Sequence, residues 1–107
     1  MYKNIEKNKP LALKDEVSYQ PGQVVSKTLV QNDKMSVTLF AFDEGEEISS
    51  HASGGDAMVT VLDGTGKFVV GGEEFILKEG ETLIMPKDIP HAVQAATPFK
   101  MLLMVSF

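Results

Sequence analysis

Two histidines, His51 and His91, are the residues of this chain best suited to chemistry. An imidazole ring titrates near neutral pH, donates or accepts hydrogen bonds, and is a common ligand of divalent metals. The chain has no cysteine, so thiolate metal sites, disulfide bonds and cysteine nucleophiles are excluded. No Ser/His/Asp order and no well-placed pair of carboxylates can be named either. Any site in this chain is therefore expected to be built around the two imidazoles.

The elements that must position these histidines are predicted to be β-strands, because apolar residues recur with period 2 between repeated turn signals. Asn32-Asp33-Lys34 and Gly71-Gly72 are the clearest of the turns. The spacing of about eight short strands favours a sandwich or barrel, and a double-sheet jelly roll fits best. Strands are expected over 24–31, 35–42, 57–62, 67–70, 73–77, 82–85, 91–95 and 101–107.

Length and composition allow one folded domain. A chain of 107 residues that is 43% hydrophobic can supply a core of ordinary size. Residues 1–16 are polar around Pro10 and are expected to form a loose arm or an edge strand, which leaves residues 17–107 as the barrel domain. The acidic run over residues 43–47 is expected to be a solvated loop, because it lacks the alternating ligands of a calcium loop.

The charge distribution excludes several partners. All ten basic residues are lysines scattered along the chain, and the net charge is -5. Nucleic acid binding requires a clustered basic face, so no nucleic acid partner is expected. The longest apolar run is too short to span a membrane, and the first residues lack the apolar stretch of a secretory signal. We therefore expect no membrane partner and a cytoplasmic location.

The strand over 35–42 is apolar on both faces. Alternation puts Val37, Leu39 and Ala41 on one face and Phe40 and Phe42 on the other. Such a strand must be covered on both sides, by the barrel interior and by something else. Without helices, a partner subunit is the simplest cover, so a homodimer is expected, with 35–42 or 101–107 at or near the interface. The six methionines are expected to fill the core or to line a soft apolar pocket.

Two segments carry a recognisable pattern. Residues 45–53, GEEISSHAS, continue to Leu62-Asp63-Gly64, and residues 80–91 read GETLIMPKDIPH. These segments resemble the first and second conserved motifs of the cupin superfamily, in the correct order and spacing, over about half of the chain. The resemblance implies a small RmlC-like double-stranded β-helix that is usually dimeric. It also implies a barrel mouth that holds a divalent metal on three histidines and a glutamate.

Carried over residue by residue, the resemblance places His51 at the first histidine position and His91 at the last. Ser53 stands at the second histidine position, and Ala57 stands at the glutamate position. Asp56 has the opposite strand parity from Ala57, so its carboxylate is expected to point out of the barrel unless a bulge at Gly54 and Gly55 turns it inward. In the second motif, Asp88 and Ala95 replace a glycine and an asparagine. Two imidazoles alone would hold a metal weakly.

The sequence therefore favours an all-β cupin barrel that binds a small organic molecule in its mouth. His51 and His91 would be the polar anchors and would hold an optional divalent metal (zinc, iron, nickel or manganese). The alternative is a metal-dependent cupin enzyme of the dioxygenase, isomerase or decarboxylase type. The pocket is expected to be lined by His51, Ser53, Ala57, Val59, Met85 and His91.

Overall fold

The computed structural model describes all 107 residues and contains nine strands and one short 3-10 helix. In chain order they are η1 Leu13–Glu16, β1 Val24–Gln31, β2 Met35–Phe42, β3 Glu47–His51, β4 Asp56–Asp63, β5 Thr65–Val70, β6 Glu73–Lys78, β7 Thr82–Met85, β8 His91–Ala95 and β9 Phe99–Ser106. No helix is long and apolar enough to cross a membrane.

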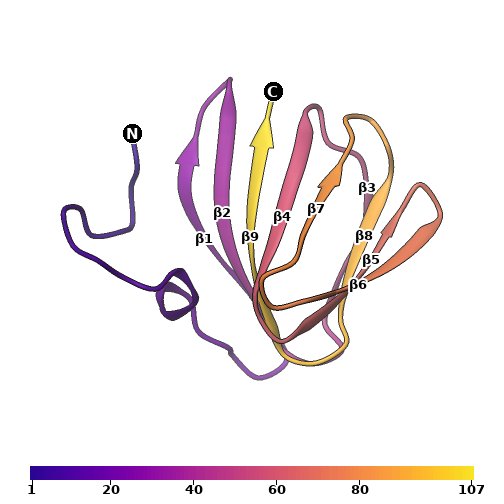
Figure 1. Cartoon of the computed structure of the whole chain (residues 1–107), viewed down its shortest axis with the longest axis horizontal. Helices are drawn as coiled ribbons and strands as arrows, with labels where there is room; N and C mark the ends of the chain where they lie inside the picture. Colours follow the sequence, from indigo (N-terminus) through magenta and orange to yellow (C-terminus); the bar gives the residue numbers. More distant parts are fainter.

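The strands form two antiparallel sheets that face one another (Figure 1). The larger sheet has the order β1-β2-β9-β4-β7, and the smaller has the order β3-β8-β5-β6. The chain crosses repeatedly from one sheet to the other, for example from β3 to β4 and from β7 to β8. This arrangement confirms the predicted all-β jelly roll.

Eight of the nine strands coincide closely with the predicted ones, and β3 is the exception. This strand begins within the acidic run that the sequence predicted as a loop. It pairs only with β8, at the edge of the smaller sheet, and all of its residues except Ile48 are exposed. A short edge strand with so little apolar content has no clear period-2 pattern, and for that reason the sequence did not reveal it.

The main core lies between the two sheets. Side chains alternate along each strand, so the inward residues of β4, β5, β8 and β9 meet in one layer. The rings of Phe42 and Phe99 stack there, with 4.6 Å between centroids, and the edge of Phe68 faces Phe99. The buried members are Phe42, Ala57, Val59, Val61, Phe68, Leu77, Met85, Val93, Ala95, Phe99, Met101 and Val105.

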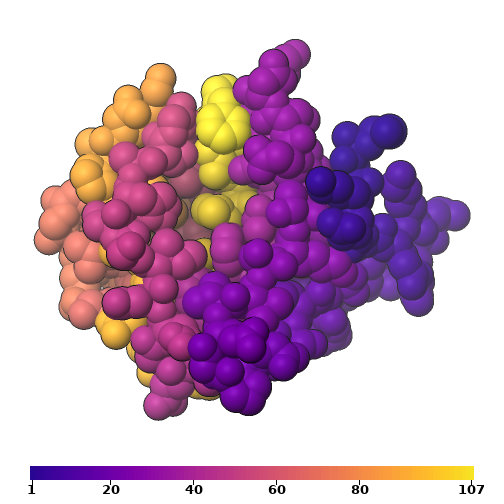
Figure 2. Space-filling view, turned by 180° about the vertical axis from the view of Figure 1, so that it is seen from behind, coloured from indigo at the N-terminus to yellow at the C-terminus, as the bar shows by residue number.

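A second cluster lies on the outer face of the larger sheet. Val37, Leu39 and Ala41 are buried there, on the face of β2 opposite to Phe42, as the alternation predicted. The expected cover was a partner subunit. In the structure, the chain's own N-terminal residues pack on part of this face through Ile5, Leu13, Val17 and Tyr19. Figure 2 shows the indigo N-terminal segment lying beside the purple strands β1 and β2.

Polar contacts fasten this N-terminal arm, which in the structure includes residues 1–19, to the barrel. The Tyr19 hydroxyl donates to Oδ2 of Asp63 at 2.6 Å, and Lys100 lies over the Tyr19 ring at 4.9 Å from its centroid. Lys100 Nζ also donates to the carbonyl of Lys14. Burial, followed by the hydrogen bond to Asp63 and its negative charge, raises the pKa of Tyr19 well above its ordinary value. The arm is therefore held at the ends of β4 and β9.

Candidate functional site

His51 and His91 lie directly opposite one another on paired strands. His51 is the last residue of β3, His91 is the first residue of β8, and the two are register partners. Their ring centroids are 4.4 Å apart with an interplanar angle of 66°, so the edge of one ring faces the other. Two residues far apart in sequence thus form a single pair of imidazoles at the edge of the smaller sheet.

A bulge in β3 allows this pairing. Ile48 pairs with Val93 and packs against the inner core, and the next register pair is His51 with His91. The step from Val93 to His91 is two positions, whereas the step from Ile48 to His51 is three. In a regular strand an odd step would put His51 on the outer face. The bulge absorbs the extra residue, so both imidazoles share the face that Ile48 and Val93 turn toward the core.

Backbone carbonyls fix the protonation pattern of both rings. Nδ1 of His51 lies 3.0 Å from the carbonyl oxygen of Ser49, and Nδ1 of His91 lies 3.2 Å from that of Ile89. A carbonyl oxygen can only accept, so each Nδ1 carries the hydrogen and donates it. In the neutral rings, both Nε2 atoms therefore keep a free lone pair. This tautomer can accept a hydrogen bond from a ligand or bind a metal ion.

The two histidines differ in exposure. His91 is only 4% exposed, whereas His51 is exposed. Burial is the main cause that lowers the pKa of His91, the positive charge of His51 lowers it further, and the hydrogen bond to Ile89 opposes the shift. His91 is therefore neutral at pH 7 and acts as a hydrogen-bond acceptor through Nε2.

The other two positions of the motif supply no metal ligand. Ala57 is buried with an inert methyl side chain, and the Ser53 hydroxyl accepts a bond from the Gly55 amide at 3.3 Å. No group of three or more His, Cys, Asp or Glu side chains gathers anywhere in the chain. The residues present do not fit a firmly held metal, because two nitrogens fill only half of a tetrahedral site.

Asp56, the carboxylate next to Ala57 in the sequence, forms a contact away from the histidine pair. Oδ1 of Asp56 accepts a hydrogen bond from the Lys87 amide at 2.8 Å, and Asp56 lines a groove on the outer face of the larger sheet. This placement agrees with the alternation along β4. The register irregularity lies between Ile48 and His51 rather than at the two glycines, so nothing turns Asp56 inward.

The remaining predicted pocket residues, Val59 and Met85, lie in the buried core and line neither hollow of the surface. Met85 pairs with Ala57 across β7 and β4. The two hollows of the molecular surface lie on outer faces, one over β2, β9, β4 and β7 and the other over β3, β5 and β8. The histidine pair is thus a surface site at the barrel rim, with a filled apolar interior beneath it.

Sequence reasoning missed the loop over residues 86–90 that supports the pair. The Asp88 amide donates to the Ser53 carbonyl at 2.9 Å, while Asp56 holds the neighbouring Lys87 amide. Asp88 has a φ of 65°, a left-handed conformation that glycine adopts without strain and aspartate tolerates. The second motif has a glycine at the position of Asp88, and that glycine was the sequence signal that could have indicated a left-handed residue in this loop. The loop ties the segment before β4 to the carbonyl that orients His91.

A family model for the cupin domain matches residues 38–106, which is more than half of the chain. The chain belongs to the cupin family. No curated protein sequence matches this cupin significantly.

Solved structures agree with the assignment. A protein of unknown function from Streptococcus pyogenes is 44% identical with a TM-score of 0.96, over 98% of this chain and 92% of that one. A cupin superfamily protein from Desulfitobacterium hafniense is 28% identical with a TM-score of 0.95, over 100% and 98% of the two chains. A salicylate 1,2-dioxygenase from Pseudoaminobacter salicylatoxidans is 22% identical with a TM-score of 0.73, over 88% of this chain and 28% of that one, and shares the fold alone.

Proposed function

We propose that this cupin binds a small organic molecule at the barrel mouth, with His51 and His91 as the polar anchors. The observation that carries the proposal is the paired geometry of the imidazoles, which are 4.4 Å apart and both oriented through Nδ1. Holding two rings in one tautomer by backbone carbonyls is typical of a recognition site, because the Nε2 atoms are then preorganised for a ligand.

The chemistry of the pair defines the class of ligand. A neutral Nε2 accepts a hydrogen bond, so the ligand should carry a hydroxyl or amide donor. Ala57 and Met85 fill the buried interior beneath the pair and leave no room inside the barrel, so the ligand should be compact enough to be held at the rim. Small phenols and hydroxy acids combine these two features.

The test is a titration of the uniformly 15N-labelled protein with phenol and with a set of small hydroxy acids, followed by NMR of the imidazole nitrogens. We expect the Nε2 resonances of both rings to shift, with affinity lost in His51→Gln and His91→Gln. Gln94→Ala, on the outer face of β8, is the matched control and should bind as the wild type does. A probe that binds the histidine variants unchanged would place the ligand elsewhere, and binding by none of the probes would contradict the proposed ligand class.

A weakly held divalent metal on the same two nitrogens is the second part of the proposal. The donor set is incomplete, so no catalytic step is assigned to a metal, and no residue arrangement favours a particular reaction. Ser53→His with Ala57→Glu would restore the missing donors. Affinity for Zn2+ should rise on the order of a thousandfold if each new ligand contributes about 2 kcal/mol.

Titration calorimetry with Zn2+ measures this gain, and adding His51→Ala should abolish it. Ala57 is buried beside Met85 and Val105, so a carboxylate introduced at this position should destabilise the metal-free variant, and Zn2+ should restore part of its thermal stability. A double variant that folds but gains no affinity would show that the two imidazoles do not share a metal position.

A further inference from the structure

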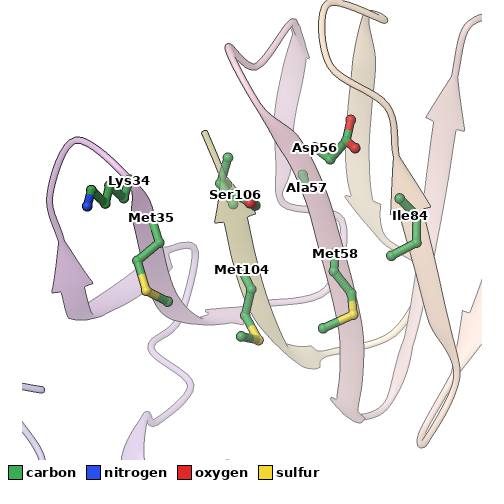
Figure 3. A pocket seen from close by; sticks show the side chains of 9 residues that line it. Lys34, Met35, Asp56, Ala57, Met58, Ile84, Met104 and Ser106 are labelled. Carbon is green, nitrogen blue, oxygen red and sulfur yellow. The ribbon is translucent and has the colours of Figure 1, made fainter.

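The inner face of the larger sheet carries hydroxyl groups on β1 and β2. Phe42 points into the main core, so alternation along β2 turns Ser36 and Thr38 to the same inner face. Thr28 of β1 is the register partner of Thr38 and shares that face. Met35, the neighbour of Ser36, lines the groove on the opposite, outer face (Figure 3). Thr28, Ser36 and Thr38 form what we call the hydroxyl cluster.

The smaller sheet does not cover this part of the inner face. Thr38, Leu103 and Val59 are aligned across β2, β9 and β4. Thr38 and Leu103 are half-buried, whereas Val59 in the same row is 0% exposed. The two sheets contact one another through β4 and β6, and β3 is the edge strand on the other side. Figure 2 shows yellow residues of β9 between the purple strands and the pink ones. The barrel is therefore open beside β2, on the side of β3.

The hydroxyl cluster has no hydrogen-bond partner among the side chains. On the outer face, the hydroxyls of Thr60 and Thr82 bond to one another at 2.7 Å. No side-chain hydrogen bond of the chain involves a hydroxyl of the cluster. A hydroxyl on an inner face is costly unless water or a ligand bonds to it. Each hydroxyl of the cluster is therefore free to donate to a ligand and to accept from it.

The cluster lies at the same end of the barrel as the histidine pair. Ser36, Val105 and Ala57 are aligned across β2, β9 and β4. Ala57 is the second residue of β4, which follows His51 after the short connection over residues 52–55. The bulge in β3 turns both imidazoles toward the space between the sheets, and the cluster points into the same space. A ligand in the opening can therefore contact both.

No charged side chain faces this opening from β1, β2 or β9. Lys27 and Lys100 are the charged residues of these strands, and they pair with Leu39 and Ala41, whose side chains lie on the outer face. A carboxylate in the opening would lose hydration without gaining a counter-charge. A neutral hydroxyl would only exchange its bonds to water for bonds to the cluster. The opening therefore favours a neutral ligand.

We propose that the opening selects neutral diols with a compact apolar frame, and that Thr38 determines this selectivity. The inference rests on the proposed function, in which one ligand hydroxyl donates to Nε2 of an imidazole. The apolar frame lies against Phe40 and Leu103, which are half-buried beside Thr38 and pack on the main core. The second hydroxyl bonds to the hydroxyl of Thr38, with Ser36 at the next inward position. The second hydroxyl of a diol is therefore preferred to the carboxylate of a hydroxy acid.

Matched aromatic probes test this selectivity. NMR titration of the 15N-labelled protein gives the dissociation constants of phenol, the three dihydroxybenzenes and 3-hydroxybenzoate at pH 7 without oxygen. The tightest dihydroxybenzene should bind about tenfold more tightly than phenol, since it adds one hydrogen bond. The 3-hydroxybenzoate anion should bind more weakly than phenol. Thr38→Val should remove the tenfold preference and leave the phenol affinity unchanged, and Thr38→Ser should keep the preference. Thr82→Val, on the outer face, is the matched control and should also keep it.

The outcomes separate this inference from the proposed function. Circular dichroism should show the valine variants folded, because valine keeps the β-branched shape that suits a strand. Equal affinities for phenol and all three dihydroxybenzenes would overturn the inference, and so would a preference that survives Thr38→Val. Phenol binding that persists in His51→Gln and His91→Gln would contradict the histidine anchors alone. Binding by none of the probes would overturn both.

Discussion

The two imidazoles touch one another but have different surroundings. His51 is exposed at the end of an edge strand, whereas His91 is buried and lies within reach of the charge on its neighbour. Protonating both rings would place two like charges at the same rim. The buried ring is therefore the one whose protonation is coupled to folding.

Unfolding should depend on pH through His91. Its folded pKa is lowered from 6.5, so between the folded value and about 6.5 the unfolded chain binds the proton more strongly. Above about pH 7 this histidine adds no pH dependence. As the pH falls below about 6.5, the unfolding free energy should fall by at most ~1.4 kcal/mol per pH unit.

Urea unfolding of the wild type and of His91→Gln measures this effect across that range. The carboxylates titrate in both proteins, so the difference between the two profiles isolates the histidine. Parallel profiles would mean that His91 has the same proton affinity folded and unfolded, and its burial would then have no effect on protonation.

At the scale of elements, the site depends on an irregularity in a short strand. The motif order predicted that the two histidines belong to one site, and alternation along β4 predicted that Asp56 points away from it. The bulge between Ile48 and His51 could not be predicted, because Ser49 and Ser50 carry no glycine or apolar signal to mark it. Sequence pattern identifies regular strands well, and it is weakest where one extra residue changes the face.

The contacts of the N-terminal arm could not be predicted from the sequence pattern either. Residues 1–16 are mostly polar and were expected to be a loose arm or an edge strand, and no sequence pattern indicated that Tyr19 would reach Asp63. That contact joins residues 44 positions apart in sequence and depends on how β4 ends. Local pattern contains no information on such pairing. Alternation along β2 therefore predicted that this strand has a buried outer face, but it did not predict that the N-terminal arm covers that face.

Tyr19→Phe should loosen the arm. The substitution keeps the ring beneath Lys100 and removes only the hydroxyl, which leaves Asp63 without its donor. A hydrogen bond to a charged acceptor contributes about 1.5–3 kcal/mol, so the free energy of unfolding should fall by about that amount or less. Limited proteolysis should also cut the arm faster. Tyr2→Phe, at an exposed ring, is the matched control, and equal effects of the two substitutions would contradict the role of the Asp63 contact.

At the scale of the whole molecule, the outer groove and the histidine pair are joined through one carboxylate. Asp56 flanks the groove and accepts the Lys87 amide hydrogen at 2.8 Å. Lys87 lies in the loop whose Ile89 carbonyl orients the His91 ring. The same loop is tied to Ser53 through the Asp88 amide. A contact made by Asp56 on the outer face therefore affects the loop that supports the histidine pair at the rim.

Removing that carboxylate, which lies on the larger sheet, should disturb the histidine pair on the smaller sheet. In Asp56→Ala the Lys87 amide loses its partner, so the loop should become more mobile and the bond from His91 Nδ1 to Ile89 should weaken. NMR of the imidazole nitrogens should then show His91 as a mixture of tautomers instead of the Nδ1–H form, while His51, oriented by Ser49 on its own strand, should change less. Asp33→Ala, in the β1–β2 turn, removes the same charge without touching the loop. If Asp56→Ala leaves the His91 tautomer as it is in Asp33→Ala, the loop holds its shape without the carboxylate, and the two faces of the barrel act independently.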